Sequence, residues 1–133
     1  MKIEKIGGFS LIELMVVIAI VATLFAYAIP NYRQYVLRSH RTEAQNALLH
    51  LTSIQERHYA NRNRYGTSAE IDLTALFPAP TNANKLFYTI TMESTNTTYT
   101  ITAVAYGKQA DDTDCITFTI DNLGEKLPVE NCW

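Results

Sequence analysis

The chain has 133 residues, of which 47% are hydrophobic and 18% are charged, and its formal net charge at pH 7 is −2. A chain of this length forms one hydrophobic core rather than two. Its slightly acidic balance also excludes a general nucleic-acid-binding protein on charge grounds.

The stretch of residues 9–29, FSLIELMVVIAIVATLFAYAI, is almost wholly apolar. As a helix that rises about 1.5 Å per residue, it spans the roughly 30 Å hydrocarbon core of a bilayer. A cleavable secretory signal is the alternative, because Lys2 and Lys5 precede the stretch, but such a signal has about 7 to 15 apolar residues followed by small ones. Here the small residues Gly7 and Gly8 precede the stretch, which favours a membrane helix.

Glu13 is an ionisable side chain inside this apolar stretch. A charge at the centre of a membrane helix costs about 2.5–3.5 kcal/mol and is usually retained for a partner. If a protease cut the chain after Gly8, the new amine of Phe9 would supply a positive charge that could pair with the glutamate of a neighbouring copy. The alternative is that Glu13 reaches the membrane interface by itself.

The segment KIGGFSLIELMVVIAIVATLFAYAIPNYRQYV resembles the class III signal of type IV prepilins. The matching features are a short charged leader that ends in glycine, then a phenylalanine, then a glutamate four positions on. The resemblance implies that prepilin peptidase cleaves between Gly8 and Phe9 and N-methylates Phe9, and that Glu13 helps select the place of the incoming subunit in the filament. Pilins of this family commonly carry a proline where Pro30 stands, and it is expected to kink or weaken the helix.

The resemblance divides the chain into a leader at 1–8, a transmembrane or filament-core helix at 9–29 and a periplasmic or extracellular head at 30–133. From Tyr32 to about Tyr59, apolar or small side chains recur with the spacing of an amphipathic helix. These side chains are Val36, Leu37, Ala44, Ala47, Leu48, Leu51 and Ile54. We therefore predict one helix of about fifty residues, half of which packs on the head.

Residues 61–85 are rich in loop-forming residues and predict a connection with at most a short helical turn. Three runs of alternating apolar and polar residues predict strands at Leu86–Glu93, Thr98–Tyr106 and Ile116–Ile120. The first two form a hairpin, because a short polar segment joins them. The apolar face of this sheet needs a cover, and only the helix stripe can supply it. The predicted fold class is α+β, with a long spine helix on a small antiparallel sheet, as the resemblance to type IV pilins also implies.

Cys115 and Cys132 are the only two cysteines, and both fall in the head. They would pair readily if the head faced an oxidising periplasm, and two free thiols are the alternative. A bond that closes such a loop stabilises the fold by about 3 kcal/mol on the chain-entropy model. The arrangement resembles the C-terminal disulfide-bounded region of type IV pilins. Positive charges flank the apolar stretch equally, so they do not decide the orientation of the helix. The two cysteines decide it, because they place the head on the oxidising side, outside the inner membrane.

No catalytic constellation stands out, because the glycines form no phosphate-binding loop and the histidines lack the spacing of a helical zinc pair. We therefore predict that the protein is not an enzyme and needs no metal or cofactor. His40 and Glu43, three residues apart, are interpreted as solvated helix side chains. Asp111, Asp112 and Asp114 could bind calcium, but a solvated loop is favoured because no glycine-bearing ligand pattern accompanies them.

The arginines are unevenly distributed. All six lie in the predicted helix or just beyond it: Arg33, Arg38, Arg41, Arg57, Arg62 and Arg64. Residues 65–133 instead carry more acids than lysines. Opposite ends of one subunit therefore carry opposite charge, which suits the stacking of neighbours in a filament.

Beyond the N-terminus, the segment RSHRTEAQNALLHLTSIQERHYANRNRYG, the threonine-rich strands and the ending GEKLPVENCW resemble the PilE-type minor pilins of gammaproteobacterial twitching pili. The resemblance implies a low-abundance subunit that passes from the inner membrane to the pilus on the cell surface and helps to prime pilus assembly. Its implied partners are the major pilin, other minor pilins and the inner-membrane assembly platform, besides the membrane and prepilin peptidase.

Two other functions stay open. A DNA-receptor minor pilin such as neisserial ComP is similar in size and plan, and the arginines support DNA as a partner. That group, however, carries an additional disulfide, and this chain has two cysteines. A pseudopilin of type II secretion shares the leader, but such proteins often lack the C-terminal disulfide and rely on calcium. A salt-dependent shift of DNA by the head would favour the receptor.

Overall fold

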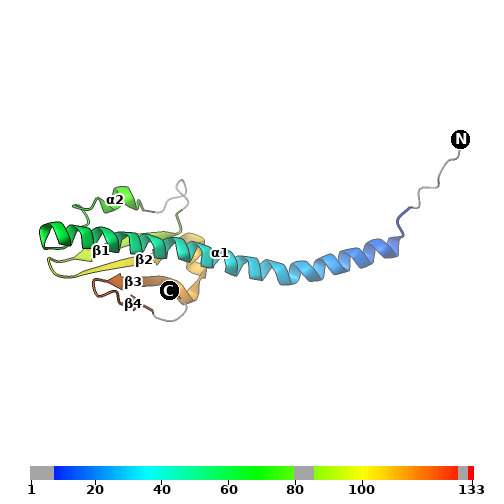
Figure 1. Ribbon diagram of the computed structural model, residues 1–133. Coiled ribbons are helices and arrows are strands. Elements are labelled where there is room, and N and C mark those ends of the chain that lie inside the picture. Colours follow the sequence, from blue (N-terminus) through cyan, green and yellow to red (C-terminus); the bar gives the residue numbers. More distant parts are fainter. Residues whose placement is uncertain (1–7, 80–85, 129–131) are drawn as a thin grey trace. The chain divides into compact units, whose positions relative to one another are not determined.

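The computed structural model describes residues 8–79, 86–128 and 132–133. The chain divides into two compact units, Met1–Val36 and Leu37–Trp133. One helix, α1 (Leu11–Arg62), begins in the first unit and ends in the second (Figure 1). Its 52 residues confirm the prediction of a single long spine helix.

In the first unit, the side chains of α1 are exposed and mostly apolar. The mean hydropathy reaches 2.5 over an 18-residue window, so the helix is long and apolar enough to cross a membrane. Two polar side chains bond within the helix: Thr23 donates to the carbonyl of Ile20 at 2.7 Å, and Asn31 donates to that of Tyr27 at 3.1 Å. Pro30 lies inside α1, and a kink there stays a prediction.

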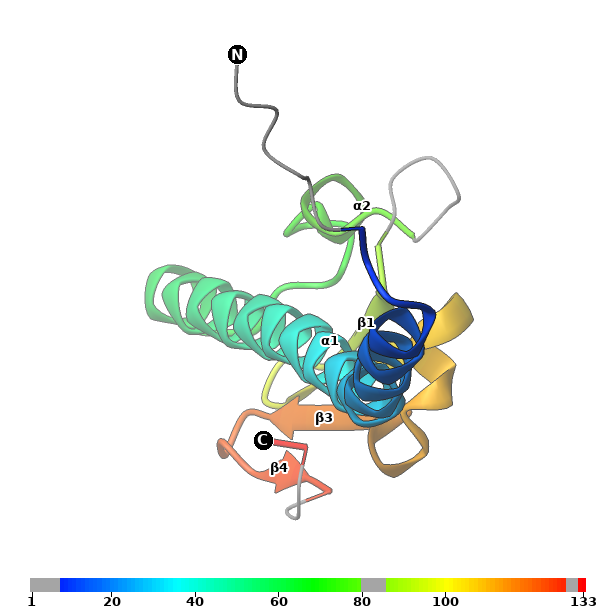
Figure 2. The ribbon, with the colours of Figure 1, turned by 90° about the vertical axis from the view of Figure 1, so that its right-hand side faces the viewer.

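In the second unit, the remainder of α1 packs on a four-stranded antiparallel sheet with the order β1-β2-β3-β4 (Figures 1 and 2). The strands are β1 (Tyr88–Ser94), β2 (Tyr99–Ala105), β3 (Thr117–Asp121) and β4 (Lys126–Leu127). The first three confirm the predicted strands, with ends shifted by one or two residues. The fourth was not predicted, because two residues are too few for a visible alternation.

The alternation along the strands places one face of the sheet in the core. The buried strand residues are Tyr88, Met92, Tyr99, Ile101, Ala103, Phe118 and Ile120. From α1, the stripe residues Ala44, Leu48 and Leu51 complete this core, as expected. The predicted α+β fold, with the helix covering the apolar face of the sheet, is therefore confirmed.

The loop after α1 is fastened to the helix by a buried glutamine. Gln55 donates to the carbonyl of Gly66 at 2.7 Å and accepts from the N–H of Gly66 at 2.8 Å. A Cβ at Gly66 would lie 3.0 Å from Ile71 and 3.1 Å from His58. Glycine at this position therefore allows the loop to approach the helix closely.

The described part of the head also contains three short helices. The first, α2 (Leu73–Leu76), lies in the connection where a short helical turn was expected. Pro80, in the same predicted connection, lies outside the described residues. Between β2 and β3, η1 (Gly107–Asp111) and η2 (Thr113–Cys115) follow one another. Gln109 lies in η1 and Asp112 lies between η1 and η2, and both side chains are buried, whereas the sequence analysis expected Asp112 in a solvated loop.

Candidate functional site

The predicted processing residues lie just ahead of α1. Gly8 and Phe9 have no regular secondary structure, and the side chain of Phe9 is 78% exposed. A Cβ built on Gly8 meets no atom within 4 Å, so packing does not require glycine here. The two residues form an accessible segment of the kind that a peptidase can bind.

Glu13 lies in the first turn of α1, surrounded by exposed apolar side chains. A carboxylate is favoured in this turn because the helix dipole places partial positive charge there. Among the residues that the structure describes, no cation forms an ion pair with Glu13. A cation that neutralises Glu13 in a bilayer would therefore have to be created by processing or supplied by another subunit.

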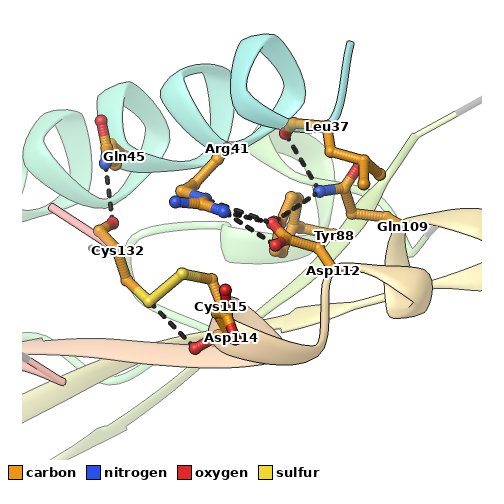
Figure 3. Close-up of a disulfide and its surroundings, with 9 residues drawn as sticks. All are labelled: Leu37, Arg41, Gln45, Tyr88, Gln109, Asp112, Asp114, Cys115 and Cys132. Atoms are coloured by element: carbon orange, nitrogen blue, oxygen red, sulfur yellow. Dashed lines mark hydrogen bonds and ion pairs between the residues drawn. A yellow bond between two sulfur atoms is a disulfide. The ribbon is translucent and has the colours of Figure 1, made fainter. Parts of the chain in front are cut away.

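A buried ion pair fastens α1 to the segment ahead of the disulfide (Figure 3). The Nη2 of Arg41 lies 2.7 Å from each carboxylate oxygen of Asp112, and its Nε donates to Oδ2 at 3.2 Å. The side chains of Arg41 and Asp112 are 13% and 5% exposed. Little water reaches the pair, so loss of either partner leaves a poorly solvated charge behind.

Gln109 connects this ion pair to the neighbouring turn of α1. Its amide nitrogen donates to the carbonyl of Leu37 at 3.1 Å and to the hydroxyl of Tyr88 at 2.9 Å, and its amide oxygen lies 2.9 Å from Nδ1 of His40. Because the nitrogen already donates, the oxygen must accept, and Nδ1 of His40 therefore carries a proton. Burial raises the pKa of Tyr88, so its hydroxyl stays neutral.

His40 differs from the expectation of a solvated helix side chain. Its ring stacks on that of Phe87, with centroids 3.3 Å apart and planes 9° apart. Glu43, three residues on, is exposed as expected. The residue that covers His40 precedes β1, so the pattern within the helix could not reveal this contact.

The loop of Asp111, Asp112 and Asp114 also differs from the expected solvated loop. Asp111 and Asp114 are exposed, but Asp112 is buried. Its two oxygens are taken up by Arg41, which leaves them badly placed to bind calcium. Asp112 therefore has a structural role in holding the helix.

The predicted disulfide is formed between Cys115 and Cys132, whose Cα atoms lie 5.5 Å apart. Both residues are fully buried. The carbonyl of Cys132 accepts a hydrogen bond from Gln45 at 2.7 Å (Figure 3). The ring of Trp133 meets that of Phe118 edge to face at 5.5 Å. The C-terminal tail is thus fastened to both η2 and α1.

The arginines are not equally available to a ligand. Arg64 donates to Glu70 at 2.9 Å, and this hydrogen bond lowers the pKa of the Glu70 carboxyl well below its usual range. Arg62 lies 3.8 Å from the same carboxylate, and the half-buried Arg41 is paired with Asp112. In the described part of the chain, three exposed arginines form no ion pair: Arg33, Arg38 and Arg57.

Two family models match the chain. Residues 30–119 match the family described as type IV minor pilin ComP, DNA uptake sequence receptor, and residues 5–29 match the prokaryotic N-terminal methylation motif. The fold is similar to the solved structure of a type IV pilin from Shewanella oneidensis, with a TM-score of 0.55 and 25% identity. That similarity covers 73% of this chain and 97% of the other.

Curated relatives resemble shorter parts of the chain. The type IV major pilin protein PilA of Myxococcus xanthus (strain DK1622) is 38% identical over 84 residues, which are 62% of this chain and 36% of that protein. The fimbrial protein EcpC of Eikenella corrodens is 59% identical over 39 residues, or 29% of this chain and 26% of that protein. The matched segments therefore span well under half of either relative.

Proposed function

We propose that this chain, which belongs to the family of the type IV minor pilin ComP, DNA uptake sequence receptor, is a minor subunit of a type IV pilus. The proposal rests on the features of the N-terminal segment. An accessible Gly8–Phe9 segment precedes an exposed apolar helix with one acid in its first turn, inside a matched methylation motif. Such a helix is stable in a bilayer or in the core of a filament and poorly soluble elsewhere.

In this proposal the leader at 1–8 is removed by prepilin peptidase and Phe9 is N-methylated. The helix at 9–29 holds the subunit in the inner membrane, with the head at 30–133 in the periplasm, until the assembly platform adds it to the fibre. The buried Cys115–Cys132 disulfide supports an oxidising location for the head. The protein then acts by binding other pilins and catalyses no reaction, and its contribution is to pilus assembly and twitching motility.

The proposal is tested by mass spectrometry of fibres sheared from cells that produce the full chain. We expect a peptide that begins at N-methylated Phe9, at low abundance relative to the main subunit. A Gly8→Val variant should accumulate uncleaved in the membrane, and because a Cβ at Gly8 touches nothing, this loss would reflect peptidase recognition rather than misfolding. Ser10→Ala serves as the control. An unprocessed chain, or a mature chain absent from fibres, would contradict the proposal.

A second candidate function is DNA binding, which the family match at residues 30–119 favours. Among the described residues, the cations open to a phosphate backbone include the exposed Arg38, Arg57 and Lys108. Arg62 and Arg64 flank Glu70, so we infer that they contribute less. A pseudopilin is less favoured, since the disulfide is present and Asp112 is held by Arg41.

DNA binding predicts a definite salt dependence. The logarithm of the binding constant should fall with the logarithm of salt concentration by about 0.9 for each phosphate contacted. The double variant Arg38→Gln, Arg57→Gln of the processed chain in detergent should weaken binding and reduce this slope by roughly 2. Arg64→Gln is the matched control, because Glu70 already holds that guanidinium. If both variants bind duplex DNA as the unaltered chain does, these arginines are not the DNA site.

A further inference from the structure

One turn of α1, just beyond the apolar stretch, is polar or amphipathic on every side. This turn consists of residues 32–35, with the sequence YRQY, and is here called the collar. All four side chains are exposed, and those of Tyr32 and Tyr35 are 68% and 71% exposed. Consecutive helical residues point about 100° apart, so the four face all directions around the helix axis. None of them takes part in an ion pair among the described residues.

The collar lies at the distance from Glu13 that a bilayer requires. No residue between Glu13 and Arg33 is charged. At a rise of about 1.5 Å per residue, the two charged residues lie about 30 Å apart along α1, which matches the thickness of the hydrocarbon core. When Glu13 lies at one boundary of the hydrocarbon, the collar therefore lies at the other boundary, among the lipid headgroups.

The side chains of the collar have the chemistry that a headgroup layer favours. Tyrosine combines an apolar ring with a polar hydroxyl and is enriched where hydrocarbon meets water. The guanidinium of Arg33 is exposed, and it can bind a lipid phosphate through two parallel hydrogen bonds. A protein partner would cover one side of the helix and leave the rest of the turn in water, whereas headgroups surround the helix on all sides.

We propose that the collar binds phospholipid headgroups in the periplasmic leaflet of the inner membrane, and that Arg33 selects anionic lipids there. This inference rests on the proposed function and extends it by naming a partner of the unassembled subunit. The tyrosine rings fix the depth of the helix, because moving them inward buries their hydroxyls and moving them outward exposes their apolar faces. The subunit must release these headgroups when it enters the fibre, so the collar opposes premature release from the membrane.

The depth of the collar can be measured on the full chain in vesicles of phosphatidylcholine and the anionic lipid phosphatidylglycerol. Gln34→Cys supplies the only free thiol, because the two native cysteines are bonded to each other. Its rate of reaction with a water-soluble maleimide is divided by the rate for Thr97→Cys, which lies in the exposed turn between β1 and β2. This ratio reports how far water reaches the collar.

Two pairs of substitutions then test the tyrosines. Tyr32→Leu with Tyr35→Leu should lower the ratio several-fold, because the turn becomes more apolar and sinks into the hydrocarbon. Tyr32→Trp with Tyr35→Trp is the matched control and should leave the ratio unchanged, since tryptophan has the same preference for the interface. If the leucine pair gives the ratio of the unaltered tyrosines, the collar does not set the depth of the helix and the proposal is wrong.

The role of Arg33 is tested by the lipids that surround the helix. In the same vesicles, spin-labelled phosphatidylglycerol should be enriched beside the chain relative to spin-labelled phosphatidylcholine. Arg33→Gln should lower this enrichment by up to about fivefold, and added salt should lower it as well. Arg57→Gln is the matched control, because that exposed arginine belongs to the head. Equal enrichment with and without Arg33 would overturn the selection of anionic lipids.

The fibres of the same variants separate this inference from the pilin function. If mature chain is found in fibres but the vesicle measurements do not respond to the collar substitutions, the headgroup contact is wrong and the pilin function stands. If the vesicle measurements respond as expected but no mature chain reaches fibres, the contact stands and the pilin function is wrong. If other pilins in cells slow the reaction at position 34 and lipid in vesicles does not, a protein covers the collar, which also contradicts the proposal.

Discussion

Replacing Asp112 by alanine is expected to destabilise the head by about 3–5 kcal/mol, which is the usual cost of removing one partner of a buried ion pair. The variant leaves the guanidinium of Arg41 in its poorly hydrated site without its carboxylate. Gln109 also loses the acceptor 3.4 Å from its amide nitrogen. The helix would then be held less firmly to the segment that precedes the disulfide.

The effect can be measured by urea unfolding of the processed chain in detergent, followed through the fluorescence of Trp133, the only tryptophan. Asp111→Ala is the matched control, since that side chain is exposed and should shift stability by no more than about 0.5 kcal/mol. The double variant Arg41→Met, Asp112→Leu should regain most of the lost stability, because no buried charge remains. Similar losses in Asp111→Ala and Asp112→Ala would show that burial of the pair is not the cause.

The long helix and the first three strands could be predicted because their patterns are periodic over many residues. The apolar positions Ala44, Leu48 and Leu51 recur at helical spacing, and all three are buried. The strand Tyr99–Ala105 alternates over its whole length, and so does its burial. Where an element is as short as Lys126–Leu127, no period exists, and only pairing with β3 defines it.

The polar interior could not be predicted in the same way, because glutamine, histidine and aspartate are usually exposed. Gln109 and Asp112 are buried only because η1 and η2 bring them to α1, some seventy residues away in the chain. The sequence contains a weak indication that Gln55 is buried, because it follows Leu51 by four residues and so continues the apolar stripe of the helix. Its partner, the backbone of Gly66, carries no side-chain signal at all.

The number of arginines in the sequence overstates the positive charge that is available to a ligand. As a set they suggest a basic surface on α1, and that was the main sequence argument for DNA. The structure separates them, because Arg41 and Arg64 are bound to acids that lie elsewhere in the chain. Net charge along a sequence therefore overestimates the charge that a ligand can meet. The proposed DNA binding would therefore depend on the few basic side chains that remain exposed.

Replacing Glu13 by alanine is expected to leave cleavage after Gly8 intact and to abolish incorporation into fibres. Cleavage should persist because Glu13 lies inside α1, whereas Gly8 and Phe9 lie ahead of it. Incorporation should fail because the amine of Phe9 in a neighbouring copy would lose its anion in an apolar surrounding. A carboxylate costs about 2.5–3.5 kcal/mol at the centre of a membrane helix and somewhat less near its end, where Glu13 lies, so a subunit gains by neutralising it on assembly.

The measurement compares mature chain in membranes with mature chain in sheared fibres for the unaltered protein, Glu13→Ala and Glu13→Gln. Both variants should be trimmed and methylated yet remain in the membrane, because each lacks the charge that pairs with the amine. Glu13→Asp is the matched control: it keeps the charge on a shorter side chain and should retain part of the incorporation. Normal incorporation of Glu13→Gln would mean that the charge is not what selects the subunit, and the exposed apolar surface of α1 alone would then have to drive assembly.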